Sequence, residues 1–261
     1  MITAASNSRI KRLVQLNQKS KLRRTEDVFL AEGVKMFLEA PTEQLQEVYV
    51  SESFLEKCSC REHLEEVGYE VVSDSVFSKI SDTCTPQGVL CVLKQFHYNI
   101  EEMLRDKAPL FLLLENIQDP GNLGTMLRTG EGAGVSGIIM SRDTVDLYNP
   151  KVIRSTMGSI YRVPFYYADD FAAAVHQVQR AGVSVYAAHL RGKNSYACQD
   201  YTKGTAFLIG NEGNGLREET AELADCYIRI PMEGKVESLN AAVASSILMY
   251  EAHRQRATIE K

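Results

Sequence analysis

Three loops in this chain carry the residue types best suited to chemistry, and each follows a short apolar stretch. The first loop, residues 115–130, reads ENIQDPGNLGTMLRTG. Asp119 and Pro120 are favourable residues to cap and begin a helix. Asn122 would then lie in the first turn, at the positive end of the helix dipole, with Arg128 more than one turn deeper. An amide, a guanidinium and close backbone approach suit a ribose-phosphate group, although a well-capped helix with a surface arginine fits the same pattern.

The second loop, residues 207–216, reads FLIGNEGNGL and holds three glycines within six residues. Asn211 and Glu212 directly follow the first of them, Gly210. A glycine-rich turn exposes backbone N–H and C=O groups, which can bind an adenine edge or a ribose. The loop contains no Lys or Arg, so a triphosphate is a poor ligand for it. The alternative is an ordinary tight turn between a strand and a helix.

The third loop opens residues 228–245, which read IRIPMEGKVESLNAAVAS. Ser238 is the predicted N-cap of the alanine-rich helix that follows, and Asn240 would lie in its first turn. The small residues allow this helix to pack closely against another element. The alternative is a capped, closely packed terminal helix without a role in chemistry.

Two other patterns exclude common cofactors. Residues 132–137 match G-x-G-x-x-G, but they end a predicted helix and precede a strand, the reverse of the dinucleotide fingerprint. The six cysteines include no C-x-x-C pair, and Cys58-x-Cys60 has no second pair to complete a zinc site. We therefore expect no metal, and we do not expect a nucleotide-dependent oxidoreductase.

The elements that must position these loops alternate from residue 110 onward. Strands are predicted at residues 110–114, 137–140, 161–164, 184–188, 205–209 and 227–230. Helices are predicted at residues 122–132, 149–157, 170–181, 216–224 and 239–254. This alternation predicts an α/β fold with a mostly parallel sheet covered on both faces. Ligands of such sheets bind outside the carboxyl ends of the strands, where the loops are expected.

The amino-terminal part has its own, smaller α/β pattern. Helices are predicted at residues 7–18, 52–67 and 75–80, with another beginning at 32, and strands at 45–51, 69–72 and 89–93. Asn7 or a neighbouring serine offers an N-cap, and Gly68 is a helix-ending signal. Residues 23–27 are expected to form a polar turn.

A polar stretch separates the two patterns. Residues 98–108 predict a linker, so we expect one domain at 1–97 and a second at 109–261. No apolar run approaches the ~20 residues of a membrane helix, and no apolar segment near residue 1 indicates a secretory signal. The expected compartment is the cytoplasm, and no membrane partner is expected.

Charge is distributed unevenly along the chain. The net charge is −5, but residues 1–24 carry seven cations and no acid, which leaves −12 for the rest. A basic segment on an acidic body favours a local contact with a phosphate backbone, although a solvated helix face is an equal alternative on charge alone. The candidate residues for this phosphate contact are Arg9, Lys11, Arg12, Arg23 and Arg24.

Taken together, the motifs from residue 110 onward resemble the SpoU/TrmH branch of the SPOUT methyltransferases, over some 150 residues. The resemblance depends on residues 119–124 with 128–129, residues 209–213 with 215–216, and residues 230–232 with 238–240. Residues 151–155 with 158–159 resemble the intermediate motif of the family. Gly130 departs from the family pattern, which more often has alanine, and this weakens the predicted helix. Residues 1–97 resemble the RNA substrate-binding domain often fused in front, an α/β fold like some RNA-binding ribosomal proteins.

The resemblance implies an S-adenosylmethionine-dependent enzyme that methylates a ribose 2′-hydroxyl of RNA. It also implies a deep trefoil knot that holds the cofactor, and a homodimer with the active site near the interface. The implied catalytic residues are Arg128, Asn122, Glu212, Ser238 and Asn240. The implied cofactor-binding residues are Gly210, Asn211, Glu212, Ile230, Met232 and Leu239.

Arg128 is also expected to contact RNA. Because arginine stays protonated, we expect it to hold a phosphate and the 2′-oxygen rather than to act as a general base. The fused amino-terminal domain favours 23S ribosomal RNA as substrate. The alternatives are a tRNA 2′-O-methyltransferase and a non-catalytic RNA-binding protein.

Overall fold

The computed structural model describes the backbone of residues 1–259 and the side chains of residues 1–257, which form two compact units. The first unit comprises Met1–Phe96 together with Asp146–Tyr161. The second comprises His97–Val145 together with the chain from Arg162 onward. Among the residues described, no helix combines the length and the apolar character needed to cross a membrane.

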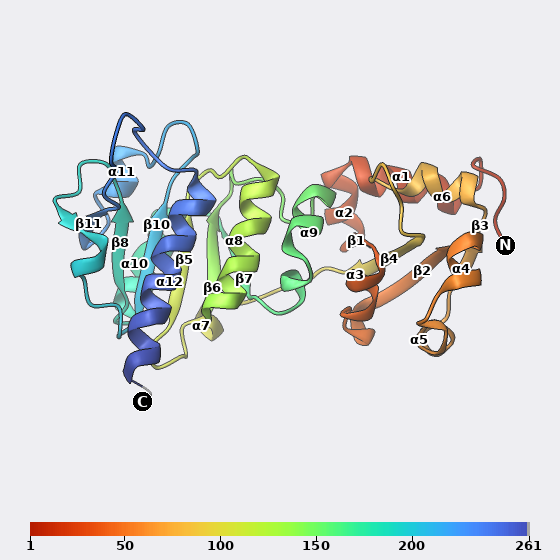
Figure 1. The fold of residues 1–261 in the computed structure, drawn as a ribbon, viewed down its shortest axis with the longest axis horizontal. Helices are drawn as coiled ribbons and strands as arrows, with labels where there is room; N and C mark the ends of the chain where they lie inside the picture. The colour runs from red at the N-terminus through yellow and green to blue at the C-terminus, as the bar shows by residue number, and fades with distance from the viewer. Residues whose placement is uncertain (260–261) are drawn as a thin grey trace. The chain divides into compact units, whose positions relative to one another are not determined.

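A seven-stranded sheet forms the centre of the second unit (Figure 1). Its strands lie in the order β7-β6-β5-β10-β8-β11-β9, and each neighbouring pair is parallel. The strands are β5 (Leu110–Leu114), β6 (Gly137–Ser141), β7 (Phe165–Ala168), β8 (Ser184–Ala188), β9 (Asn194–Ser195), β10 (Thr205–Ile209) and β11 (Cys226–Arg229). The predicted α/β fold with a mostly parallel sheet is confirmed, while the trefoil knot stays a prediction.

Helices cover both faces of this sheet, which explains why β5, β6 and β10 are buried along their whole lengths. On one face, α8 (Pro120–Ala133) packs against α12 (Ala241–Ile259) (Figure 1). On the other face, α10 (Phe171–Arg180) packs with α7 (Ile100–Met103) and α11 (Glu218–Ala221) on alternate strand residues such as Phe111 and Leu113. The expected linker therefore contains a short helix that belongs to the core of the second unit.

The first unit is built on a four-stranded sheet of order β1-β4-β2-β3. β4 is antiparallel to both of its neighbours, and β3 is parallel to β2. The strands are β1 (Val28–Glu32), β2 (Leu45–Ser51), β3 (Glu70–Val72) and β4 (Val89–Lys94). The helices are α1 (Ser8–Gln18), α2 (Ser20–Glu26), α3 (Val34–Leu38), α4 (Glu52–Lys57), α5 (Arg61–Val67), α6 (Asp74–Ile80) and α9 (Pro150–Thr156). The buried apolar faces of α1 and α6 form one core with this sheet, as the helical spacing of Ile10 and Leu13 predicts.

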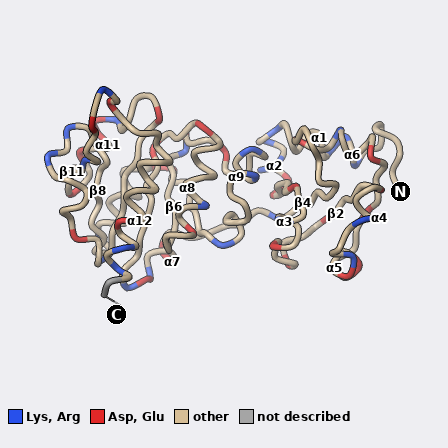
Figure 2. The backbone as a smooth tube through the Cα atoms, viewed as in Figure 1, with Lys and Arg blue, Asp and Glu red and all other residues tan. Residues whose placement is uncertain are grey.

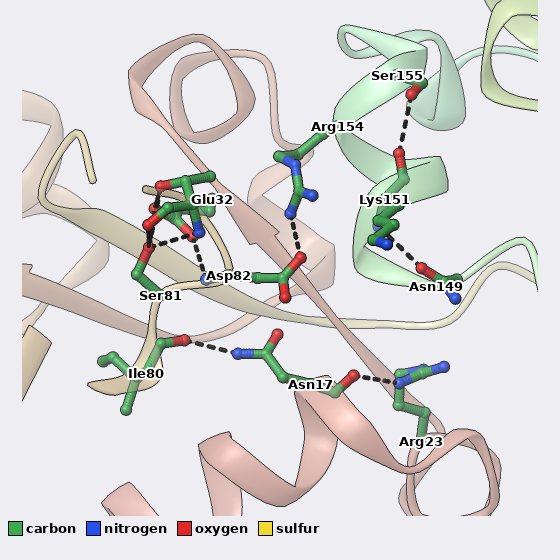
Figure 3. Close-up of polar contacts among 11 residues, drawn as sticks. Asn17, Arg23, Glu32, Ile80, Ser81, Asp82, Asn149, Lys151, Arg154 and Ser155 are labelled. Atoms are coloured by element: carbon green, nitrogen blue, oxygen red, sulfur yellow. Dashed lines mark hydrogen bonds and ion pairs between the residues drawn. The ribbon is translucent and has the colours of Figure 1, made fainter. Parts of the chain in front are cut away.

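The segment Asp146–Tyr161 connects β6 to β7 in the sequence, yet it packs within the first unit. The Tyr148 ring lies 4.7 Å from the Phe29 ring of β1, and its hydroxyl accepts a hydrogen bond of 2.7 Å from the Phe96 N–H. On α9, Arg154 forms an ion pair of 2.5 Å with Asp82 (Figure 3). The sequence alone places this segment in the second domain, because the βα alternation continues through it without a break.

Several element boundaries differ from the prediction for tertiary reasons. The strand expected at 161–164 is wrong: Tyr161 ends a 3₁₀ helix and donates its hydroxyl to the Met36 carbonyl, and β7 begins only at Phe165. The polar turn expected at 23–27 is wrong, because these residues lie mostly in α2. The helix expected at 52–67 is interrupted at Cys58, whose backbone is extended.

Candidate active site

The carboxylate of Glu212 connects the loops that follow β5 and β10. Its Oε1 accepts hydrogen bonds of 3.0 Å from both the Asp119 N–H and the Asn122 Nδ2. Its Oε2 accepts a hydrogen bond of 3.1 Å from the Gln118 N–H. The Oδ1 of Asn122 accepts a further hydrogen bond of 2.9 Å from the Nδ2 of Asn240. Side chains from all three predicted loops therefore form one chain of hydrogen bonds, which we name the Glu212–Asn122–Asn240 network.

The surroundings of Glu212 favour its ionised form. Burial opposes ionisation, but hydrogen bonds from the Asn122 side chain and from the N–H groups of Asp119 and Gln118 outweigh it. The pKa of Glu212 is therefore held below its ordinary value. The negative charge lies at the start of α8, where the helix dipole also favours it.

Asn211 shapes the loop after β10. Its Oδ1 accepts hydrogen bonds from the N–H groups of Gly213 at 2.9 Å and Asn214 at 3.0 Å. Its Nδ2 donates to the Asn116 carbonyl at 2.8 Å. Both polar ends of the amide are used within the protein, so Asn211 contributes to the site by fixing the loop.

Gly210 is required by the packing of the same loop. A Cβ atom at this position would lie 2.2 Å from the backbone of Gly215 and of Leu216. No real Cβ approaches backbone so closely, so any larger residue would displace the loop. The sequence predicted a close backbone approach at Gly210, and the structure shows that it is between Gly210 and the backbone of Gly215 and Leu216 in the same loop.

The N-cap of α12 is Asn240 and not Ser238 as predicted. The Oδ1 of Asn240 accepts hydrogen bonds from the N–H groups of Ala242 at 2.9 Å and Val243 at 3.2 Å. The helix starts at Ala241, and Ser238 lies exposed in the irregular segment before it. Asparagine and serine are about equally favourable N-cap residues. Because the cap uses only the Oδ1 of Asn240, its Nδ2 remains available to donate to Asn122.

A cavity of about 310 Å³ lies at the carboxyl ends of β8, β10 and β11. All six residues expected to bind the cofactor line it, together with Ser238. Its apolar lining residues include Ile209, Leu216 and Ala244, and its other lining residues include the glycine loop 210–215 and the acidic residues Glu212 and Glu237. Apolar walls suit an adenine ring, backbone groups suit its edge, and carboxylates suit a positively charged sulfonium, so the donor set fits S-adenosylmethionine.

Arg128 lies apart from this cavity. It is exposed on α8 and is not among the residues that line the cavity of its own chain. In the described part of the chain, no hydrogen bond or ion pair involves its guanidinium. The structure therefore places Glu212 and Ser238 on the wall of the cavity and joins Asn122 and Asn240 to Glu212 through hydrogen bonds, while Arg128 belongs to neither arrangement.

The basic segment is less available than its charge suggests. Arg23 is only 3% exposed, and it donates hydrogen bonds to the Leu16 carbonyl at 2.6 Å and to Asp146 at 2.5 Å. A phosphate cannot reach this guanidinium, so Arg23 is a structural residue and not the RNA contact that we expected. The charge pattern alone could not indicate this, since Asp146 lies more than a hundred residues away.

Two further arginines of the segment are paired. Arg12 contacts the carboxylates of Glu26 and Glu47, both at 2.7 Å, and Arg9 contacts Glu70 at 3.1 Å. Lys11 and Arg24 are exposed, as are Lys19 and Lys21. Figure 2 shows these cations distributed along α1 and α2.

Sequence reasoning missed Glu115, the first residue of the first loop. Its side chain is 2% exposed and accepts hydrogen bonds from the Arg217 N–H at 2.8 Å and from the Thr220 hydroxyl at 2.5 Å. It thereby holds the start of α11 against the end of β5. The signal was present: a carboxylate directly after five buried strand residues needs partners within the protein.

Comparison with known proteins agrees with this site. Residues 109–250 match the model of the SpoU rRNA Methylase family, and residues 7–91 match the MRM3-like substrate binding domain. The chain is 32% identical over 252 residues to the 23S rRNA (guanosine(2553)-2′-O)-methyltransferase RlmP of Bacillus subtilis, covering 95% of this chain and 97% of the relative.

Solved structures resemble the chain over almost its whole length. The AdoMet-bound rRNA methyltransferase from Sinorhizobium meliloti has a TM-score of 0.85 at 30% identity and covers 97% of both chains. The SpoU methyltransferase AviRb from Streptomyces viridochromogenes, in complex with AdoMet, has a TM-score of 0.88 at 26% identity and covers 97% of this chain and 99% of its own. The family model covers more than half of the sequence, and the similarity to RlmP extends through both units. The chain belongs to the SpoU rRNA methylase family.

Proposed function

We propose that this protein transfers the methyl group of S-adenosylmethionine to a ribose 2′-hydroxyl of ribosomal RNA, with 23S RNA as the substrate. The observation that carries the proposal is the Glu212–Asn122–Asn240 network beside the cavity of about 310 Å³. This network holds the loops after β5 and β10 and the start of α12 in one fixed arrangement. Family membership supplies the reaction, and we expect a protein that acts on ribosomal RNA to work in the cytoplasm.

Different residues at the cavity would bind the cofactor and orient the ribose. The apolar side chains Ile230, Met232 and Leu239 and the loop fixed by Asn211 would hold the cofactor. When bound, S-adenosylmethionine supplies an electrophilic methyl carbon on a sulfonium. Ser238 on the wall of the cavity would hold the ribose, with Asn122 fixing the loop beside it. Alignment of the 2′-oxygen with that carbon would lower the entropic part of the barrier by several kcal/mol.

The 2′-hydroxyl must lose its proton as the new oxygen–carbon bond forms. Asn122 and Asn240 are neutral amides, so they take up no proton and act only by holding the surrounding loops in position. A guanidinium beside the 2′-oxygen would stabilise the developing negative charge, and it would simultaneously hold an adjacent phosphate. Arg128 is the residue assigned to this role.

Arg128 reaches the cavity of a partner subunit in a homodimer. This assignment is supported by its absence from the wall of its own cavity, with its guanidinium exposed on α8. The neighbouring helix α12 exposes Val243 at 48% and Tyr250 at 49%, apolar and aromatic surface that a second copy would cover. One active site would then combine Arg128 of one protomer with Asn240 of the other.

A mixed dimer tests the shared site and the reaction together. The Arg128→Ala and Asn240→Ala homodimers should both be nearly inactive in methyl transfer to a 23S RNA fragment. A heterodimer of the two, purified through two different tags, places both lesions in one site and none in the other. It should recover roughly half of the wild-type activity, since one of two equivalent sites is intact.

The controls separate the possible failures. If each chain builds its own site, mixing restores nothing, and the shared site is wrong. Wild-type protein that transfers no methyl group to any ribosomal RNA fragment would refute the function itself. Mapping of 2′-O-methylation in ribosomal and transfer RNA from a deletion strain then decides between 23S RNA and tRNA as substrate.

A further inference from the structure

A second cavity, of about 580 Å³, adjoins the cofactor cavity at the edge of the sheet. Leu190 and Arg229 line both cavities, so the two are neighbours. Its other charged residues are Arg191 and Lys193, and no acidic residue lines it. We name this second cavity the basic groove. Figure 2 shows the Lys and Arg positions on the loops beside β11.

The basic groove is an ordered part of the fold. The segment that carries Lys193 continues into β9, which pairs in parallel with β11 through Ile228 and Arg229. Gly192 presses against the end of β11, because a Cβ there would lie 2.8 Å from the Ile228 carbonyl carbon. The His189 N–H donates to the Ile228 carbonyl at 3.0 Å. These contacts hold Lys193 and Arg229 on adjacent segments.

The positive charge of the basic groove is only partly neutralised. Arg191 is ion-paired with Glu218. Lys193 and Arg229 are both exposed and take part in no ion pair among the described residues. Two uncompensated cations facing one hollow indicate an anionic ligand, and an exposed, open groove indicates one that extends beyond it.

We infer that the basic groove binds the phosphodiester backbone of the RNA next to the nucleotide that is methylated. This inference rests on the proposed function: a ribose held at the mouth of the cofactor cavity has a phosphate on each side, and the adjoining hollow is where its strand would continue. The groove thus adds Lys193 and Arg229 to the RNA-binding surface. The same charges could instead attract the carboxylate of the cofactor, so the test separates the two anions.

The test neutralises both cations in Lys193→Gln/Arg229→Gln. RNA affinity is measured by fluorescence anisotropy with a 23S RNA fragment between 50 and 300 mM salt, roughly the range in which phosphate contacts control affinity. Loss of two contacts should lower the slope of log affinity against log salt by about 1.4, since each contact to a single strand contributes about 0.7. KM for RNA should rise together with this fall in slope. Calorimetric affinity for S-adenosylmethionine is measured on the same variant, because Arg229 also lines the cofactor cavity.

The matched control is Lys107→Gln/Lys203→Gln, which removes the same charge from two exposed lysines of the second unit that line neither cavity. Its salt slope should equal that of the wild type. The charge-preserving variant Lys193→Arg/Arg229→Lys should restore the slope, which separates loss of charge from loss of folding.

Two results would overturn the inference. A neutralised variant that matches the control in salt slope and KM, while the wild type methylates ribosomal RNA, refutes the basic groove alone. A variant that loses cofactor affinity with an unchanged slope shows that these residues hold the cofactor carboxylate instead. Failure of the wild type to methylate RNA would refute the proposed function, which is a different outcome.

Discussion

The sequence predicted functional residues in two regions: the loops after β5 and β10, and the basic segment of α1 and α2. The structure brings the predicted residues of the loops together, but it pairs several of the predicted arginines of the basic segment with acids of the same chain. In the loops, Asn122 contacts Glu212 directly, and it also contacts Asn240 at the start of α12. In the basic segment, Arg12 and Arg23 contact carboxylates instead of facing solvent. Residues at the ends of neighbouring strands are brought together by the sheet, whereas a surplus of charge in the sequence says nothing about which acids the fold will supply.

The contrast between Arg23 and Arg24 gives the largest expected effect. Arg23→Gln leaves Asp146 and two helix carbonyls without a buried partner, so the free energy of unfolding should fall by about 3 kcal/mol. Arg24→Gln removes the same charge from an exposed position and should change it by less than about 0.5 kcal/mol. Urea unfolding of both variants measures this, and equal stabilities would show that the Arg23 contacts contribute nothing.

Removal of the negative charge of Glu212 should have the second-largest effect on the free energy of unfolding. Removing it in Glu212→Gln weakens charge-assisted hydrogen bonds and should lower the free energy of unfolding at pH 7 by about 2 kcal/mol.

The pH dependence of this effect has a definite sign. Because the folded-state pKa of Glu212 lies below its unfolded value, its contribution is present above the unfolded pKa and is lost as pH falls through the folded pKa. The wild type and the variant should therefore converge in stability in acid. A difference that persists unchanged at low pH would mean that shape, and not charge, is responsible.

Asn240 and Ser238 provide a matched pair for the cap of α12. Asn240→Ala removes two hydrogen bonds to helix N–H groups and should cost about 1 kcal/mol of unfolding free energy. Ser238→Ala should leave stability unchanged within about 0.5 kcal/mol, because Ser238 is exposed and precedes the cap. Thermal unfolding compares them; a larger loss for Ser238→Ala would restore serine as the cap.

The smallest expected effect is an increase in stability, from the substitution Gly130→Ala. Gly130 lies in the interior of α8, and a Cβ there would meet Val135 and Met249 at ordinary distances of 3.5 to 3.8 Å. Gly130→Ala should therefore raise the free energy of unfolding by about 0.5–1 kcal/mol through helix propensity. Gly210→Ala is the contrasting variant, since its Cβ would overlap the backbone and should destabilise the protein.

The sequence by itself determined the central strands and the cap of α8, and it singled out six residues that the structure places around one cavity. Leu110–Leu114, Ser184–Ala188 and Thr205–Ile209 are strands with the predicted bounds. The first and third are buried along their whole lengths, as expected for mostly apolar runs in the middle of a parallel sheet. Asp119 caps α8 through a local hydrogen bond of 2.8 Å to the Asn122 N–H, which depends on residues three apart.

Only the tertiary structure decided which polar residues stay free. Asp146 meets Arg23, and Tyr161 meets Met36, across more than a hundred residues of sequence. These contacts place Asp146–Tyr161 in the first unit, although the local pattern reads as a continuation of the second. Local hydrogen bonding and hydrophobic periodicity act over a few residues and can be read along the chain. Ion pairs and the packing of an inserted segment depend on distances that exist only after the chain has folded.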